Sequence, residues 1–164
     1  MSISAGFSAV AYCLTTGSRA TWGTETAGVH VGAAPGSLVE MKCVRDLTIP
    51  LEMGEADITT RGDKGNMITL PTLLKCSVDI SAIWNTADPV VLALLSAFVQ
   101  RKTIPIAFLD RPSTEDGATG TWADYVVTKW EKGEALAEGQ TAKFTVKPGP
   151  SLVPPEVVRV GDDD

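Results

Sequence analysis

The clearest pattern along the chain is a regular alternation of apolar and polar residues over residues 73–84. A period of two is typical of a β-strand that packs one face on a core and exposes the other to water. We therefore expect one antiparallel strand here, with Lys75 and Asp79 on its wet face. The apolar face comprises Leu74, Cys76, Val78, Ile80 and Ala82.

Residues 88–102 carry the only strong helical pattern. Asp88 is a favourable N-cap and Pro89 suits the first helical position. Positive charge from Arg101 and Lys102 at the other end favours a helix C-terminus. The residues expected on the buried stripe, spaced i, i+4 and i+7, are Val91, Leu95 and Phe98.

The remaining periodic segments favour strands. Residues 38–53 read as a long strand or a bulged pair, with a bulge near Val44 and a bend at Pro50. Gly62, Asp63, Gly65 and Asn66 form a turn cluster inside residues 55–70. Further strands are expected at residues 7–14, 104–110, 121–132 and 140–147, the last two forming a hairpin.

These elements predict a mainly β protein of about eight strands. The fold class that fits is an antiparallel β-sandwich or barrel with one flanking α-helix, at about residues 88–102, and long loops. We assign residues 1–150 to a single β domain. Residues 151–164 are expected to be an extended acidic tail, because the chain from residue 148 onward has four prolines and ends in three aspartates.

The segment 15–37 contains five glycines and is too long for an ordinary connection. It lacks the apolar area to order on its own. Two interpretations remain open: a mobile loop, or an arm that orders against another subunit. Under the second interpretation Trp22 is a candidate contact between subunits.

Charge and composition exclude several classes of function. The chain has 164 residues, with 14 Lys and Arg against 20 Asp and Glu, giving a net charge of -6. Tight non-specific binding to nucleic acid needs a basic surface, so we do not expect it. The longest apolar stretch, Val90–Val99, is too short to cross a bilayer, and residues 1–18 lack the basic start of a signal peptide. We expect no membrane insertion.

Catalytic and metal-binding patterns are missing from the sequence. The three cysteines, Cys13, Cys43 and Cys76, and the single histidine, His30, have no zinc-site spacing. A nucleophilic triad would have to use His30, which lies in the glycine-rich segment. We expect no enzyme, no cofactor and no metal. The Arg61–Gly62–Asp63 tripeptide is expected to be a turn rather than an adhesion motif.

One block of sequence resembles a known family. From Val44 to Trp84 it reads VRDLTIPLEMGEADITTRGDKGNMITLPTLLKCSVDISAIW, with the run EADITTRG followed by the short turn at Leu70–Leu73. An Asp-Pro-initiated helix, a strand and the closing segment Trp130–Pro148 follow in order. Together these features, over about residues 40–150, resemble the major tail tube proteins of long-tailed, siphovirus-like bacteriophages.

The resemblance implies a structural role in the virion tail. Proteins of this family form sixfold rings that stack into a hollow tube, through which the genome passes without specific binding. The expected partners are identical subunits, a tail terminator, and tip and tape-measure proteins, with synthesis and assembly in the host bacterial cytoplasm. Joining strands across subunits would also remove sheet edges, which otherwise invite uncontrolled pairing.

The resemblance also suggests where the contacts lie. The hairpin loop Glu55–Gly65 is the candidate for contacts between subunits or rings, and Asp57 and Arg61 are its expected charged partners. The wet face of the strand at 73–84 is expected to line the channel, where acidic groups would repel DNA phosphate. The contact candidates are Glu55, Asp57, Thr60, Arg61, Asp63 and Trp22, and the lumen candidates are Lys75 and Asp79.

Two alternatives stay open. A tube protein of a contractile tail, or of a related secretion machine, would share the logic of rings and stacks. A monomeric β-sandwich binding module, such as an adhesin or carbohydrate binder, would instead have an aromatic-lined groove and remain a single chain at all concentrations.

Overall fold

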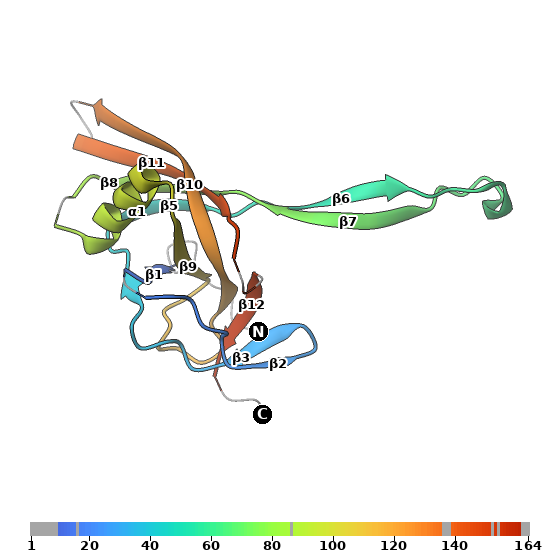
Figure 1. The fold of residues 1–164 in the computed structure, drawn as a ribbon, viewed down its shortest axis with the longest axis horizontal. Coiled ribbons are helices and arrows are strands. Elements are labelled where there is room, and N and C mark those ends of the chain that lie inside the picture. The colour runs from blue at the N-terminus through green and yellow to red at the C-terminus, as the bar shows by residue number, and fades with distance from the viewer. Residues whose placement is uncertain are drawn as a thin grey trace.

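The computed structural model of the chain describes residues 10–15, 17–85, 87–135, 139–151, 153 and 155–161. The fold is mainly β, with a single α-helix in this described part, as the sequence predicts. Two sheets are present: a large twisted one that forms the body and a two-stranded one that projects from it (Figure 1). The strands are β1 Val10–Cys13, β2 Thr24–Thr26, β3 Val29–Gly32, β4 Val39–Glu40, β5 Val44–Thr48, β6 Leu51–Asp57, β7 Thr69–Cys76, β8 Val78–Ile83, β9 Thr103–Leu109, β10 Thr119–Ala135, β11 Gly139–Pro148 and β12 Glu156–Val160.

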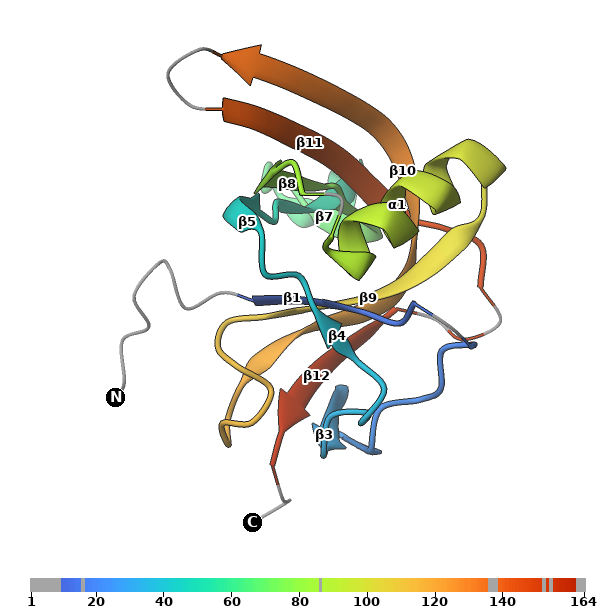
Figure 2. The same cartoon turned by 90° about the vertical axis from the view of Figure 1, so that its left-hand side faces the viewer.

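The long strand β10 organises the body. Its first half pairs with both β9 and β12, and its second half pairs with β11 in an antiparallel hairpin. From β11 the sheet continues through β8 to β5, and β1 joins β9 to the small strand β4. All of these pairs are antiparallel, whereas β3 pairs with β12 in parallel. The curved sheet therefore has β5 as the last strand of one branch (Figure 2).

The strands predicted at 38–53 and 73–84 are each divided. The first contains β4, β5 and the start of β6, and the second contains the end of β7 followed, after Ser77, by β8. This division separates the two-stranded sheet β6–β7 from the body. We call this hairpin, residues 51–76 with its tip, the arm.

Helix α1, Pro89–Gln100, begins and ends close to the predicted bounds. The Asp88 side chain accepts a hydrogen bond from the Val90 amide, and Arg101 closes the helix in a left-handed conformation. The helix packs on β10 and β9. Of the predicted stripe, Val91 is fully buried and Leu95 and Phe98 are half-buried, because Val90, Leu94 and Ala97 share the buried side.

The main core lies between α1 and the sheet. It contains the inward side chains of β8 and β11, including Ile80 and Phe144, together with Phe108 and Tyr125, whose rings meet edge to face. The alternation predicted over 73–84 is confirmed on β8, where Val78, Ile80 and Ala82 are buried and Asp79 is exposed.

A second core lies beneath residues 15–37, the glycine-rich segment that the sequence left open as a mobile loop or as a contact with another subunit. Trp22 is 1 % exposed and meets Trp122 edge to face, with ring centroids 5.8 Å apart. The glycines of this segment permit close backbone contact: a Cβ on Gly23, at φ +48°, would lie 1.9 Å from the Val31 carbonyl oxygen. The segment therefore orders against β9, β10 and β12 of its own chain, which is neither the mobile loop nor the contact with another subunit that the sequence left open.

The C-terminal segment also differs from the expected extended tail. Residues Glu156–Val160 form β12, which inserts between β3 and β10, and Val158 is completely buried. Its pattern of alternating burial is that of a strand with one face on the core. The acidic end, residues 162–164, lies outside the described residues.

Candidate assembly surfaces

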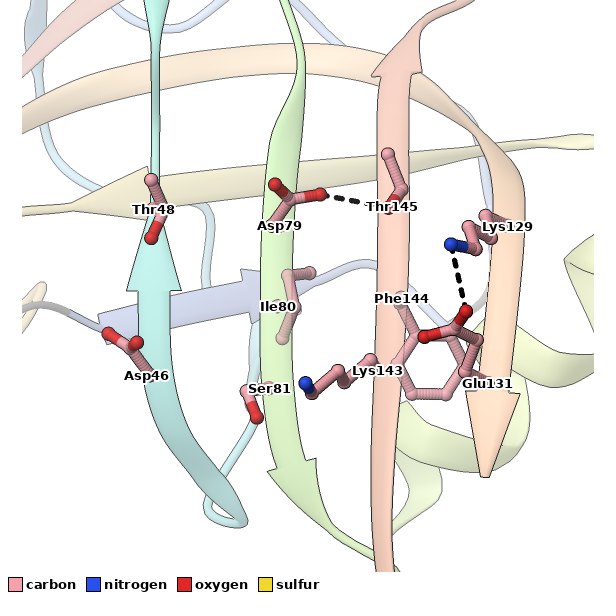
Figure 3. A pocket seen from close by; sticks show the side chains of 10 residues that line it. All are labelled: Asp46, Thr48, Asp79, Ile80, Ser81, Lys129, Glu131, Lys143, Phe144 and Thr145. Atoms are coloured by element: carbon pink, nitrogen blue, oxygen red, sulfur yellow. Dashed lines mark hydrogen bonds and ion pairs between the residues drawn. The ribbon is translucent and has the colours of Figure 1, made fainter. Parts of the chain in front are cut away.

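One face of the sheet is polar across four neighbouring strands. Figure 3 shows its side chains side by side on β5, β8, β11 and β10. The pairing arranges them in two rows perpendicular to the strands. The first row is Thr48, Asp79, Thr145 and Lys129, and the second is Asp46, Ser81, Lys143 and Glu131.

One hydrogen bond joins two residues within the first row, and one ion pair joins the first row to the second. The Thr145 hydroxyl donates to Asp79 Oδ1 at 2.8 Å, and Lys129 Nζ lies 2.8 Å from Glu131 Oε1. The hydrogen bond and charge of Glu131 raise the pKa of Lys129, and those of Lys129 lower the pKa of Glu131. Acidic and basic groups are therefore interleaved on this face, which differs from the acidic lumen that the net charge would permit.

The opposite face of the same strands is apolar and packs into the main core, to which α1 also contributes. Val78, Ile80 and Phe144 point into the main core with the buried side of the helix. We call this region of β5, β8, β11 and β10 the polar wall: one side faces the core and the other, polar side faces water. On its polar side a hollow lies between the two rows.

This wall has two edges without a partner strand in the described part of the chain. One is β5, which pairs only with β8. The other is residues 127–135 of β10, because β9 stops pairing at Val126 and β11 occupies the other edge. Unpaired backbone N–H and C=O groups along an edge are ready to pair with another strand.

The arm is the second exposed surface. Apart from each other, β6 and β7 share no substantial contact with another element (Figure 1). On its outer half Ala56 pairs with Leu70, and the Ile58 amide donates to the Ile68 carbonyl at 3.0 Å, which places these four side chains on one face. The side chains of Ile58, Ile68 and Leu70 are all exposed, as is Met67 at 72 %.

Two predicted contact residues shape the tip of the arm. Asp57 Oδ1 accepts hydrogen bonds from the Thr59 amide at 2.9 Å and from its hydroxyl at 2.5 Å, which lowers the pKa of Asp57. Asp63 Oδ2 accepts from the Thr60 amide at 2.5 Å and from its hydroxyl at 3.0 Å. These bonds fold residues Arg61–Asp63 into a single 3-10 turn, as expected for the tripeptide.

The structure brings the other predicted residues together only in part. Glu55 and Arg61 are exposed on the arm, so they stay candidates for contacts, whereas Trp22 offers no surface because it is buried in the second core. Asp79 lies on the polar wall. Lys75 belongs to β7, where it pairs with Glu52, so it does not share a strand with Asp79 as the sequence suggested.

A buried ion cluster was missed by the sequence analysis. Arg19 Nε lies 3.2 Å from Asp124 Oδ2, and Arg19 Nη1 lies 3.7 Å from Glu156 Oε1. Glu156 Oε2 accepts from the Trp22 amide, and Arg19 also donates to the carbonyls of Trp122 and Val153. The signal in the sequence was a lone arginine three residues before a tryptophan, which is too weak to find the cluster.

Three comparisons place this geometry among known proteins. No protein-family model and no curated protein matches the sequence. Solved structures do match: the tail of an empty GTA particle, with C6 symmetry, at a TM-score of 0.62 and 10 % identity, over 91 % of this chain and 96 % of that one. The SPP1 tail tube matches with a TM-score of 0.62 and 12 % identity, over 94 % of this chain and 78 % of that one. A virion of a native gene transfer agent matches with a TM-score of 0.58 and 9 % identity, over 79 % of this chain and 93 % of that one.

The chain has the fold of these tail structures. In this tail fold the polar wall and α1 lie on opposite sides of the same strands. The described residues contain no cluster of His, Cys, Asp and Glu able to hold a metal, and no helix among them is long and apolar enough to span a bilayer. Burial raises the pKa of the Cys13 thiol to about 12, which keeps it protonated and unreactive at neutral pH.

Proposed function

We propose that this protein is a structural subunit of a phage-type tail tube. Copies join into sixfold rings, the rings stack into a hollow tube, and the polar wall lines the channel through which the genome passes. The protein then resides in the virion tail and has no catalytic role. A terminator, a tip and a tape-measure protein are the proposed partners at the ends and inside of the tube.

The observation that carries this proposal is the pair of unpartnered edges on a four-stranded wall. Each neighbouring pair in the order β5, β8, β11, β10 is antiparallel, so β5 and β10 run in opposite directions. When rotation about an axis along the tube places β10 of one copy beside β5 of the next, these two strands are also antiparallel. The same step repeats around a ring and leaves neither of these two edges exposed.

This geometry argues against a monomeric binding module. A lone chain would expose both edges and the apolar face of the arm to water, which promotes aggregation. A ring covers the edges, and stacking of rings gives the arm a surface on which to dock. The polar wall, with its interleaved charges, stays wet in the channel.

Negative-stain electron microscopy of the concentrated protein tests the function. We expect long tubes of uniform width, or annular rings at lower concentration. Purified chains that stay monodisperse at every concentration, even with a preformed tail tip added as a nucleus, would contradict the proposal.

The charged residues of the arm give a second test. We expect Arg61→Ala to impair polymerisation while the body stays folded, because Arg61 is exposed at the tip. Asp57 needs a matched pair of variants, since Asp57→Ala removes both the charge and the acceptor that holds Thr59. Asp57→Asn keeps an acceptor oxygen and removes only the charge.

The rate of assembly, followed by light scattering, separates the two roles of Asp57. If its charge contacts a neighbour, Asp57→Asn and Asp57→Ala slow assembly equally. If Asp57 only shapes the tip, Asp57→Asn assembles like the unmodified chain and Asp57→Ala does not. Normal assembly of Arg61→Ala and of both Asp57 variants would remove these residues from the interface.

A further inference from the structure

We infer that Asp46 of one subunit pairs with Lys129 of the next, and that this contact sets the register between neighbouring copies in the ring. The inference rests on the proposed function and identifies the residues that align one copy with another. The wall carries two polar rows across its four strands. Both rows end at the unpartnered edges, at Asp46 and Thr48 on β5 and at Lys129 and Glu131 on β10.

A strand can join an edge only in registers that keep polar side chains on the polar face. Because side chains alternate along a strand, a shift by one residue would turn the Asp46 side of β5 toward the core. The allowed registers therefore differ by two residues. Three of them bring the short strand β5 beside the charged part of β10.

The register in which the rows run straight across the interface is unfavourable. The first row would continue from Lys129 to a neighbouring Thr48, and the second from Glu131 to a neighbouring Asp46. Two carboxylates would then lie directly opposite each other, and like charges at opposing positions destabilise a sheet. Lys129 Nζ, 2.8 Å from Glu131 Oε1 in the single chain, offsets part of this repulsion but has no carboxylate directly opposite it in this register.

A shift of two residues in one direction removes this repulsion and forms an ion pair. Asp46 then lies opposite Lys129, the bulge between Val44 and Asp46 lies opposite Trp130, and Glu131 lies past the bulge, where β5 offers no carboxylate. The Asp46–Lys129 contact joins opposite charges. A stagger of this kind at each junction is also what a closed barrel of tilted strands requires.

The shift in the other direction has no such pairing. Thr48 would lie opposite Glu131 and Asp46 opposite Gly133, while Lys129 would lie beyond the end of β5 at Thr48. That register loses the attraction and shortens the paired region. Charge complementarity therefore selects the register that pairs Asp46 with Lys129.

Both side chains are available for this contact in the single chain. Asp46 and Lys129 are exposed, and the Lys129–Glu131 pair lies at the surface, where it can rearrange. Lysine on an edge strand also discourages unwanted pairing with other sheets. An incoming edge strand that places a carboxylate opposite Lys129 forms an ion pair with it, whereas other edge strands leave the charge of Lys129 without a partner across the junction.

Charge reversal tests the pair. We expect Asp46→Lys and Lys129→Asp each to raise the critical concentration for tube formation about tenfold, because each places like charges across the interface. The double variant restores much of the loss. Lys143→Asp, a reversal on the same face but inside the wall, is the control and stays near the unmodified value.

Engineered cysteines test the register directly in assembled tubes. Opposed residues in neighbouring strands are close enough for a disulfide. We expect the variant with Asp46→Cys and Lys129→Cys to oxidise into a ladder of covalent oligomers up to six subunits. The variant with Thr48→Cys and Lys129→Cys represents the straight register and stays monomeric on a denaturing gel.

The outcomes separate the inference from the proposed function. Tubes in which Thr48→Cys and Lys129→Cys cross-link, or in which the double charge reversal gives no recovery, overturn the register and leave the tube role standing. An unmodified protein that forms no rings or tubes overturns both. Cross-linking of the Asp46 variant together with recovery in the double reversal establishes the pair.

Discussion

Shortening the arm is expected to stop tube growth while leaving the body folded. The variant replaces residues 54–73 with the two residues Asn-Gly. This turn then links Met53 to Leu74, which are paired in the hairpin. Asn-Gly is a favoured two-residue connection between antiparallel strands. Neither core contains residues 54–72, the part of the replaced segment whose side chains are described, so the melting temperature should change little.

The expected product of this variant is single rings. The unpartnered edges of β5 and β10 are unchanged and still close the ring, whereas the exposed face of Ile58, Ile68 and Leu70 that would dock on another ring is gone. A companion variant keeps the full arm and replaces these three side chains with threonine. Electron microscopy distinguishes rings from tubes in both cases.

If the shortened variant formed tubes of normal length, the arm would have no part in stacking. If it formed neither rings nor tubes but melted normally, the arm would instead be needed within the ring. If the threonine variant formed normal tubes, the apolar face would not be the stacking contact, and the tip of the arm would be. Each result identifies a different contact for the arm.

Replacing Arg19 with methionine is expected to cost the most stability of any single change considered. The Arg19 side chain is 1 % exposed and balances Asp124 and Glu156, whose side chains are 15 % and 3 % exposed. Removing one member of a buried charge cluster leaves the others uncompensated and typically costs about 3–5 kcal/mol. For a domain of this size the melting temperature should fall by roughly 6–20 °C.

The control for this experiment is Arg159→Met on β12. Arg159 alternates with the buried residues of that strand and is exposed, so its replacement should change the stability by less than about 0.5 kcal/mol. The pair Arg19→Met with Glu156→Gln should be less damaging than the sum of its parts, because the second change removes an orphaned charge. Equal melting temperatures for Arg19→Met and Arg159→Met would show that the cluster contributes no stability.

The cluster also explains why the two ends of the chain were misread. The glycines of residues 15–37 predicted a loop or a contact with another subunit, and the prolines and aspartates near the C-terminus predicted an extended tail. The structure pairs them: Arg19 and Trp22 come from the first and Glu156 from the second, and both segments meet on β10. Long-range complementarity of this kind leaves no periodic signal in a single sequence.

Local patterns, in contrast, were strong where one residue type decides the structure. The Asp88–Pro89 pair fixed the start of α1, and alternation identified the faces of β8. The turn residues at 62–66 correctly marked the tip of a hairpin. The sequence did not show that this hairpin leaves the body, because a strand on an arm and a strand in a wall can have the same alternation.

The candidate site was predicted unevenly for the same reason. The period of two correctly placed Asp79 on the wet face of its strand. Lys75, four residues earlier, instead belongs to the arm, because the strand is interrupted at Ser77. The residues at the unpartnered edges, Asp46 and Lys129, become visible only when the order of strands in the sheet is known. Edges are a property of topology, which no single segment of sequence contains.

The most direct test of the account is a cryo-electron microscopy map of the assembled protein that resolves individual strands. We predict that β5 of each subunit lies beside residues 127–135 of β10 in its neighbour, antiparallel and at normal strand spacing, so that the walls form one continuous barrel around the channel. Subunits that meet through α1 or the arm alone, with β5 and β10 still facing solvent, would contradict it.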